Sequence, residues 1–506
     1  MPSGKAANIL FIMVDQMTPG VLPSYGGKVV RSPHLDALAE RSVLFDSAYC
    51  NAPLCAPSRF SMMTGRLPKA IGAFDNACDL AADRPTFAHY LRHAGYRTAL
   101  SGKMHFCGPD QLHGFEERLT TDIYPADYGW FCDWEDFETR PSWYHNMASV
   151  LNAGPCVRSN QLDFDDEVGF NAERWLYDWV RGNDERPFAL TVSFTHPHDP
   201  YAIGWDYWRR YSDDEIDMPQ VKIDPKDLDP HSKRLRHVYA LEGLDIPEDK
   251  VRAARRAYYG AISYLDDKIG RLLSVLDQIG VARDTYIVFC GDHGDMLGER
   301  GLWYKMSWFE PSSRIPLMIA GPGIRPGQVS SSVSLVDLLP TLAELAGDGK
   351  APDYATEIDG RSLQGHLSGS GGHDEVLGEY CGEGAIAPLF MIRRGRFKYI
   401  ATAPDPDQLF DLEADPHELN NLAEDPNAAA TLAAFREEAA TRWDAEGLRD
   451  QVLDSQRRRR LVYQALSQGE RLPWDFQPLV DASERYMRNH RDLDDVEGDA
   501  RWPRTE

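Results

Sequence analysis

Three apolar segments of the sequence each end in residues that can bind a metal or move a proton. The segments are residues 8–14, 188–194 and 286–290. They are followed, in the same order, by Asp15-Gln16, by Thr195-His-Pro-His-Asp-Pro200 and by Gly291-Asp-His-Gly-Asp295. Open α/β sheets place their ligands just beyond the carboxyl ends of the strands. Three such coincidences predict one shared site at one edge of a sheet.

Cys55 lies in a different pattern, one that surrounds a candidate nucleophile. A single cysteine is by default a small buried apolar residue. Here Pro53-Leu-Cys-Ala-Pro-Ser-Arg59 places Pro two, Ser three and Arg four positions after Cys55, and Thr64-Gly-Arg66 follows. We know no purely structural motif with this spacing, so the pattern favours a chemical role for Cys55.

This segment resembles the sulfatase signature C-x-P-S-R with its trailing T-G-R. A second segment, Gly95-Tyr-Arg-Thr-Ala-Leu-Ser-Gly-Lys-Met-His105, resembles the second sulfatase signature, G-Y-x-T-x-x-x-G-K-x-H. The two occur in the family's order and separation, and the resemblance covers about residues 8–425. It implies the fold of the alkaline phosphatase superfamily, with a large mixed sheet sandwiched by helices and a smaller C-terminal subdomain.

The resemblance implies that a formylglycine-generating maturation enzyme oxidises Cys55 to formylglycine. A thiol that attacked sulfur would form a bond that is hard to cleave. An aldehyde hydrate instead supplies a hydroxyl nucleophile, and its second hydroxyl can collapse to the aldehyde and expel sulfate. One difficult step is thereby divided into two.

The family also carries one divalent cation, and the matching ligands are Asp15, Asp292 and the formylglycine made from Cys55. Many arylsulfatases have Asp-Asp and Asp-Asn where this chain has Asp15-Gln16 and Asp292-His293. The branch with choline sulfatases and phosphonate monoester hydrolases resembles this variant, which makes His293 a further ligand and Gln16 a weaker candidate. The oxygen-rich set favours Ca²⁺ first, then Mg²⁺, while the imidazole leaves Mn²⁺ open.

A sulfate monoanion needs a local cluster of basic groups in a chain this acidic. The residues that match the family's motifs are Arg59, Lys103, His105, His198 and Lys305. Lys103 and Lys305 would hold sulfate oxygens, and Arg59 would orient the hydrate. His105 would assist activation of the hydrate. His198 would face the leaving oxygen as a hydrogen-bond donor or acid.

His196 is an alternative to His198. If both residues lie on a strand, their side chains are two positions apart and would point to the same face of the sheet. The family pattern places the functional histidine directly before x-Pro, which ranks His198 first.

Within the family, the chain most resembles choline sulfatases. The resemblance rests on residues 102–105, 108–130, 194–201 and 483–490. A trimethylammonium group needs an aromatic face and a nearby carboxylate, and the residues that match the family's choline pocket are Trp130, Asn146, Glu383 and Asp494. The last of these implies a tail that reaches a neighbouring subunit, hence a homo-oligomer (dimer or tetramer), with choline sulfate as the substrate.

The elements that must position these residues alternate between strand and helix. Helical patterns at residues 33–42, 86–93 and 248–279 lie between the apolar strands, which predicts an α/β domain. From about residue 375 four short strand candidates follow closely, with a helix at 428–443, as in a small antiparallel sheet. We therefore expect a catalytic domain at 1–374, an α+β subdomain at 375–445 and an extended oligomerisation tail at 446–506, in which we find no clear period.

The composition of the chain indicates which partners are unsuitable and in which cell compartment the protein is expected. Across 506 residues, 54 Lys+Arg against 79 Asp+Glu give a net charge of −25, which argues against nucleic acid and anionic lipid as partners. Eight sparse cysteines and the lack of an apolar leader or a membrane-spanning run predict a reduced, cytoplasmic protein, although a signal peptide absent from this sequence is an open alternative.

Two other functions compete with the sulfatase interpretation. A phosphonate monoester or phosphodiester hydrolase of the same superfamily would share the metal, the formylglycine and most of the basic groups, and would differ in the leaving-group pocket. A non-catalytic binding protein on the same fold would usually lack a ligand or the nucleophile. All of these residue types are present in this chain.

Overall fold

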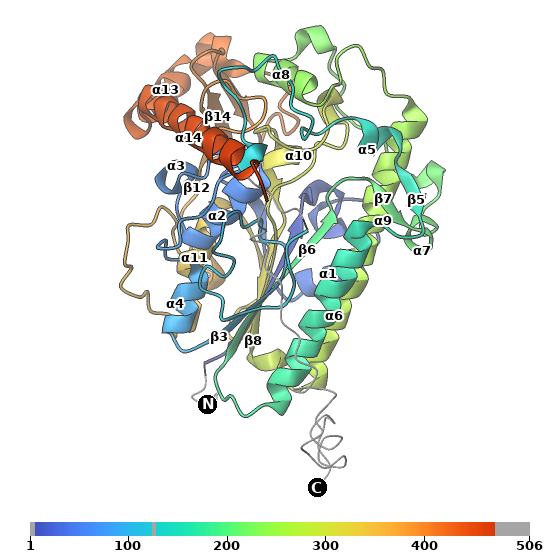
Figure 1. Ribbon diagram of the computed structural model, residues 1–506, viewed down its shortest axis with the longest axis vertical. Coiled ribbons are helices and arrows are strands. Elements are labelled where there is room, and N and C mark those ends of the chain that lie inside the picture. The colour runs from blue at the N-terminus through green and yellow to red at the C-terminus, as the bar shows by residue number, and fades with distance from the viewer. Residues whose placement is uncertain (1–5, 124–127, 471–506) are drawn as a thin grey trace.

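The computed structural model describes residues 6–123 and 128–470, and a large mixed sheet runs through its centre (Figure 1). The described strands of this sheet follow the order β11-β2-β10-β8-β1-β6-β3-β4, and β9 pairs with β2. Their bounds are β1 Asn8–Asp15, β2 Val43–Tyr49, β3 Arg97–Gly102, β4 Glu117–Arg118, β6 Phe188–Pro197, β8 Thr285–Gly291, β9 Arg314–Ile315, β10 Leu317–Ala320 and β11 Gly327–Ser334.

The four strands β8, β1, β6 and β3 lie side by side at the middle of this sheet and run parallel. The residues of β1, β6 and β8 are almost all buried, on both faces of the sheet, which is why these three strands read as apolar runs in the sequence. Because the strands are parallel, the polar residues after all four meet at one edge. The sequence prediction of a shared edge for the three apolar strands is confirmed.

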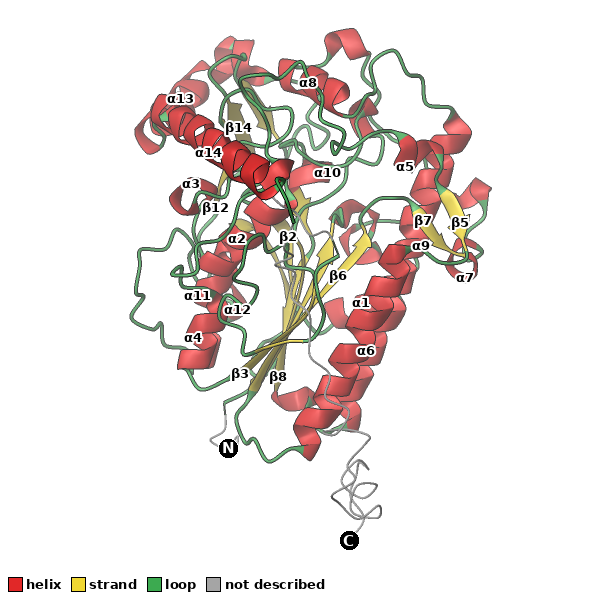
Figure 2. Ribbon diagram, in the orientation of Figure 1, coloured by secondary structure: helices red, strands yellow, loops and turns green. Residues whose placement is uncertain are grey.

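Helices cover both faces of the sheet (Figures 1 and 2). Odd and even residues of β1 point to opposite faces, as a pleated strand requires. Ile9, Phe11 and Met13 join a core cluster with α2, α4 and α11, whereas Leu10, Ile12 and Val14 join another with α1, α6 and α9. The bounds of these helices are α1 Pro33–Ala39, α2 Cys55–Thr64, α4 Phe87–His93, α6 Asn160–Arg181, α9 Glu248–Gln278 and α11 Leu338–Ala346.

A second, antiparallel sheet has the order β12-β13-β14-β15. Its strands are β12 Glu375–Tyr380, β13 Leu389–Arg394, β14 Phe397–Ala401 and β15 Gln408–Asp411, and α13 (Ala429–Arg442) packs on it. The shorter elements are α3 Pro68–Ile71, α5 Ala148–Leu151, α7 Trp205–Trp208, α8 Pro230–Val238, α10 Glu310–Ser313, α12 Gln364–Leu367, β5 Gly154–Cys156, β7 Ala202–Gly204 and the 3₁₀ helix η3 Tyr128–Trp130.

The predicted fold class is confirmed: a large mixed α/β sheet between helices, a smaller antiparallel sheet and a further C-terminal segment. The sequence did not predict α14, a helix of 22 residues from Ala445 to Leu466. Its outward face is rich in arginine, so its apolar periodicity is weak, and several of its contacts use polar side chains. The domain boundaries at residues 374 and 445 stay predictions.

Candidate active site

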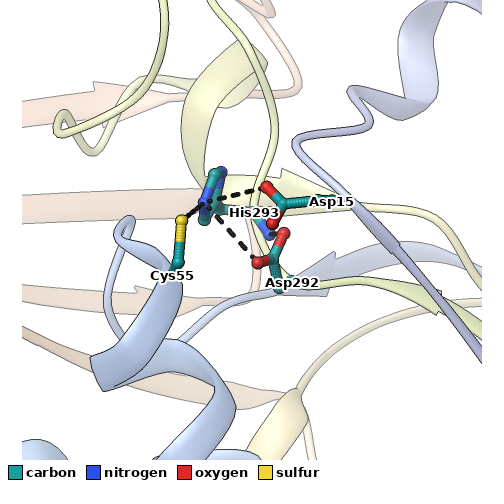
Figure 3. A group of neighbouring side chains, drawn as sticks. All are labelled: Asp15, Cys55, Asp292 and His293. Carbon is teal, nitrogen blue, oxygen red and sulfur yellow. Dashed lines mark hydrogen bonds and ion pairs between the residues drawn. The ribbon is translucent and has the colours of Figure 1, made fainter. Parts of the chain in front are cut away.

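Four buried side chains meet beyond the carboxyl ends of β1 and β8 (Figure 3). They are Asp15, Cys55, Asp292 and His293, and their ligand atoms all lie within 4.8 Å of one another. His293 Nε2 lies 3.3 Å from the sulfur of Cys55. The same nitrogen is 3.8 Å from Asp15 Oδ1 and 3.7 Å from Asp292 Oδ2. Two carboxylates and an imidazole thus converge on one side of the thiol.

This group fits a divalent cation. Asp15 Oδ1 is buried and has no hydrogen-bond partner among the described residues. A buried carboxylate oxygen without a partner carries a desolvation cost that a bound cation would remove. Oxygen donors with one imidazole form a set that hard or borderline divalent cations accept. The unpaired oxygen and the donor set therefore both indicate a metal site.

Arg59 lies behind the carboxylates, and its side chain has no exposed surface. Its Nη2 donates to Asp15 Oδ2 at 3.0 Å and its Nε to Asp292 Oδ2 at 2.8 Å. Its Nη1 donates to the carbonyl oxygen of Lys103 and to Ser193 Oγ. A planar guanidinium that bridges the two acids fixes their separation. These contacts place Arg59 against the carboxylates, where it can position the metal ligands.

Cys55 is the first residue of α2, so its sulfur lies at the positive end of a helix. Lys103 Nζ lies 3.8 Å from the sulfur and donates to Asp15 Oδ2 at 2.5 Å. Burial opposes ionisation of the thiol, but the charges of Lys103, Lys305 and His293 outweigh it and hold the pKa of Cys55 well below its usual range. The position stabilises negative charge, as a nucleophile or a bound anion needs.

Lys305 joins the metal group to the histidines of the pocket. Its Nζ donates to Gln16 Oε1 at 2.7 Å, and lies 2.7 Å from His198 Nε2 and 3.3 Å from His145 Nε2. Burial and the neighbouring Lys305 lower the pKa of His145 to about 3. His145 is therefore neutral at physiological pH, and Lys305 supplies the positive charge here.

A pocket of about 270 Å³ opens above Cys55. The predicted residues that line it come from seven separate parts of the chain: Cys55, Lys103, His105, Trp130, Asn146, His198, Lys305 and Glu383. His105 lines the pocket next to Cys55, and a hydrogen bond from its side chain is among the interactions that lower the pKa of the Cys55 thiol. Lys103 and Lys305 give the end near Cys55 a positive charge.

The other lining groups suit a cation instead. The rings of Trp130 and Trp143 are nearly parallel, with an interplanar angle of 2° and centroids 6.0 Å apart. Glu383 is only 1% exposed, and its Oε2 has no hydrogen-bond partner among the described residues. Burial raises the pKa of Glu383 to about 8. An unpaired buried carboxyl that lines the same pocket as two aromatic rings is an environment that suits a quaternary ammonium ion.

The structure gives two further residues, Gln16 and His196, different surroundings from those that the sequence suggested. The amide oxygen of Gln16, a weaker ligand candidate, accepts a hydrogen bond from Lys305, and its nitrogen donates to Asp295 at 2.7 Å, so protein groups engage both ends of this amide. His196 does not share the pocket with His198. The register between β1 and β6 shifts at their carboxyl ends, and His196 Nδ1 bonds to Asp165 instead.

The remaining site predictions have different outcomes. Asn146 lines the pocket, but its side-chain oxygen accepts from the backbone of Ala148 at 2.8 Å. Asp494 lies outside the described residues. The sequence interpretation missed His145 and Asp199, which also line the pocket, although His145 directly precedes the predicted Asn146. A histidine in a long loop carries no periodic signal, so only its position against Lys305 reveals it.

The comparisons with known proteins agree with this geometry. The sulfatase family model matches residues 7–348, two thirds of the chain. The chain belongs to the sulfatase family, and it is a sulfatase by its fold, by its two signatures and by the residues that these bring together. The model for the choline sulfatase C terminus matches residues 450–502, and a C-terminal model of N-sulphoglucosamine sulphohydrolase matches 298–443.

Individual relatives narrow the resemblance. The chain is 51% identical to a choline-sulfatase of Rhizobium meliloti (strain 1021), over 100% of both chains. It is 30% identical to the mouse (Mus musculus) iduronate 2-sulfatase, over 72% of this chain and 74% of that one. Among solved structures, the phosphonate monoester hydrolase of Agrobacterium radiobacter superposes with a TM-score of 0.69 at 25% identity, over 88% of this chain and 96% of that one. Within the described residues, no helix is both long and apolar enough to cross a membrane.

Proposed function

We propose that the chain hydrolyses choline-O-sulfate to choline and sulfate. One observation carries the proposal: a single pocket is lined both by the basic groups around Cys55 and by an unpaired buried carboxyl, Glu383, together with the stacked rings of Trp130 and Trp143. Choline-O-sulfate has an anionic and a cationic end, so it matches both. The full-length identity to a choline-sulfatase and the matched C-terminal model support this substrate.

We infer that Cys55 acts as formylglycine, made by a maturation enzyme. In that form it supplies a hydroxyl nucleophile. Lys103 and Lys305 hold the sulfate oxygens and stabilise the charge that develops on them. His105, whose side chain interacts with the Cys55 thiol, accepts a proton at the nucleophile's position. His198 Nε2, hydrogen-bonded to Lys305, faces the leaving oxygen.

Asp15, Asp292, His293 and the modified Cys55 would hold a divalent cation, with Ca²⁺ proposed first and Mg²⁺ or Mn²⁺ as alternatives. When bound, the cation polarises the sulfate and lowers the pKa of the nucleophile. Arg59 keeps the two carboxylates at a fixed separation, because it donates to both. Metal analysis of the purified protein by mass spectrometry would identify the ion, and a stoichiometry far below one per chain would contradict the site.

The phosphonate monoester hydrolase alternative has its own support in the structural superposition at 25% identity. The two functions differ at the leaving-group end, where Glu383 favours a cation. We further propose a homo-oligomer in which Asp494 of the tail completes a neighbouring pocket. Asp494 lies within the residues that the choline sulfatase C-terminal model matches.

One assay separates the candidates. Sulfate release from choline-O-sulfate is compared with hydrolysis of a phosphonate monoester, using protein co-expressed with a maturation enzyme. We expect kcat/KM to be far higher for choline-O-sulfate, and Cys55→Ala to abolish both activities. A preference for the phosphonate ester would contradict the proposal and favour the alternative. Activity that survives in Cys55→Ala would show a contaminating enzyme.

A further inference from the structure

Helix α14 lies against the segment that contains Trp130, which with Trp143 forms the aromatic wall of the pocket (Figure 1). It contacts η3, which ends at Trp130. Gln456 Oε1 accepts a hydrogen bond from the backbone of Trp134 at 3.1 Å. Arg460 donates to Asp133 at 2.5 Å, and its guanidinium lies 5.4 Å from the ring centroid of Phe131. Several side chains of α14 therefore hold the residues directly after Trp130.

Beneath these contacts lies an ion pair between Arg459 of α14 and Asp75. Arg459 is 7% exposed and Asp75 is fully buried. The guanidinium donates to both carboxylate oxygens, with Nη2 at 3.0 Å from Oδ2. The same carboxylate accepts the backbone N–H of Ala77 at 3.0 Å and that of Cys132 at 3.3 Å. One buried carboxylate thus ties together α14 and two separate loops.

Both of these loops contribute to the pocket. Asn76, next to Asp75, lines it, and its Oδ1 accepts the backbone N–H of Ala56, the residue after Cys55. Cys132 follows Trp130 by two positions. The ion pair therefore lies between the segment at the nucleophile and the segment at the aromatic wall, where it can set the distance between them.

The ion pair is not required to attach the helix. Leu448, Val452 and Leu453 of α14 are buried in the main core cluster and provide apolar attachment. A buried ion pair contributes little to stability compared with apolar residues of similar size. The ion pair instead fixes the orientation of Asp75, because an arginine that donates to both carboxylate oxygens holds the carboxylate in one plane. Arg459 also lies in the region matched by the choline sulfatase C-terminal model and beyond the other two matched regions.

We propose that Arg459 is a positioning residue for specificity: through Asp75 it holds the Trp130 segment at the distance from Glu383 that a quaternary ammonium ion requires. Helix α14 thereby determines which leaving group the pocket accepts, while the basic end at Cys55 acts on any sulfate ester. This inference rests on the proposed function and deepens it.

The experiment compares Arg459→Lys with the wild type, both in the matured form. Lysine keeps the charge but cannot hold both carboxylate oxygens in one plane. We expect KM for choline-O-sulfate to rise about tenfold, with kcat changed less than about threefold and KM for 4-nitrophenyl sulfate changed less than about twofold. The calorimetric Kd of choline should rise by the same factor as KM. Arg458→Lys, a neighbouring exposed arginine paired with Asp454, is the matched control and should behave as the wild type.

The outcomes separate the inference from the proposed function. Equal effects of Arg459→Lys on both esters, or unchanged choline binding in a folded variant, would overturn the positioning role alone. A wild type that cleaves 4-nitrophenyl sulfate but neither cleaves choline-O-sulfate nor binds choline would overturn the proposed function. If circular dichroism shows that Arg459→Lys does not fold, the same kinetic comparison is made with Arg460→Gln. A rise of about twofold or more in KM for choline-O-sulfate alone supports the inference, and no rise overturns it.

Discussion

The two ends of the pocket are built differently. At the Cys55 end, the groups follow adjacent parallel strands and the first turn of a buried helix, and Arg59 connects the two carboxylates of the metal group. At the Glu383 end, the groups lie on loops, and contacts from α14 hold one of them in place. Under the proposed function, the Cys55 end would supply chemistry that any sulfate ester uses. The Glu383 end would supply recognition of one leaving group, and loops are where such recognition usually lies.

This contrast predicts that changes at the first end act on kcat or on metal binding and folding, and changes at the second act on KM for one substrate. The predictions that follow test the division, and each could break it by producing the other pattern.

The largest effect is expected for Cys55→Ala, which removes the nucleophile. We expect kcat to fall by at least about 10⁴-fold for every sulfate ester, because the other groups cannot replace a covalent nucleophile. Calorimetry should show that choline binds with a Kd within about threefold of the wild-type value. A large loss of choline binding would show that the two ends are not independent.

Arg59→Met should come next, and it should act on folding and metal binding together. Removal of Arg59 leaves Asp15 and Asp292 buried without their shared partner, which costs about 3–5 kcal/mol in unfolding free energy. Urea denaturation monitored by circular dichroism measures this loss. Arg458→Met, at an exposed position on α14, is the control and should change stability by less than about 0.5 kcal/mol. Equal losses in both variants would contradict the assigned role of Arg59.

Glu383→Gln should affect only the recognition end. The amide keeps the shape of the side chain but removes the charge that faces the cation. We expect KM for choline-O-sulfate to rise roughly 10- to 100-fold, and KM for a neutral aryl sulfate to change less than about threefold. Steady-state kinetics with both esters provides the measurement. An equal rise for the two esters would remove Glu383 from choline recognition.

The smallest effect is a pH dependence that arises from the same residue. Burial raises the pKa of Glu383 to about 8, so the carboxyl is mostly neutral below that pH and ionised above it. Only the ionised form attracts the cation, so KM for choline-O-sulfate should fall as pH rises from 7 to 9, by about tenfold. A neutral ester is the control, and its KM should not follow this trend. In Glu383→Gln the trend should disappear, and its persistence would assign it to another group.

Much of the fold was predictable because its signals are local. The buried strands read as apolar runs, and the four short strands from residue 375 matched closely, since alternation and turns lie within a few residues of each other. Helix α14 was not predictable, because an arginine-rich surface hides its apolar face. The register shift that separates His196 from His198 could not be predicted either, because the alternation of side chains along a strand carries no sign of it.

By itself, the sequence determined which chemistry is available: a cysteine in a sulfatase signature, acids and histidines after buried strands, and lysines in recognisable motifs. The tertiary structure alone decided how these groups share their contacts. In the folded protein the side-chain oxygen of Gln16 accepts a hydrogen bond from Lys305, and His145 lies beside the same lysine. Arg459 forms an ion pair with Asp75, which is 384 positions away in the sequence. Such contacts depend on how distant segments pack, and local periodicity carries no information about that packing.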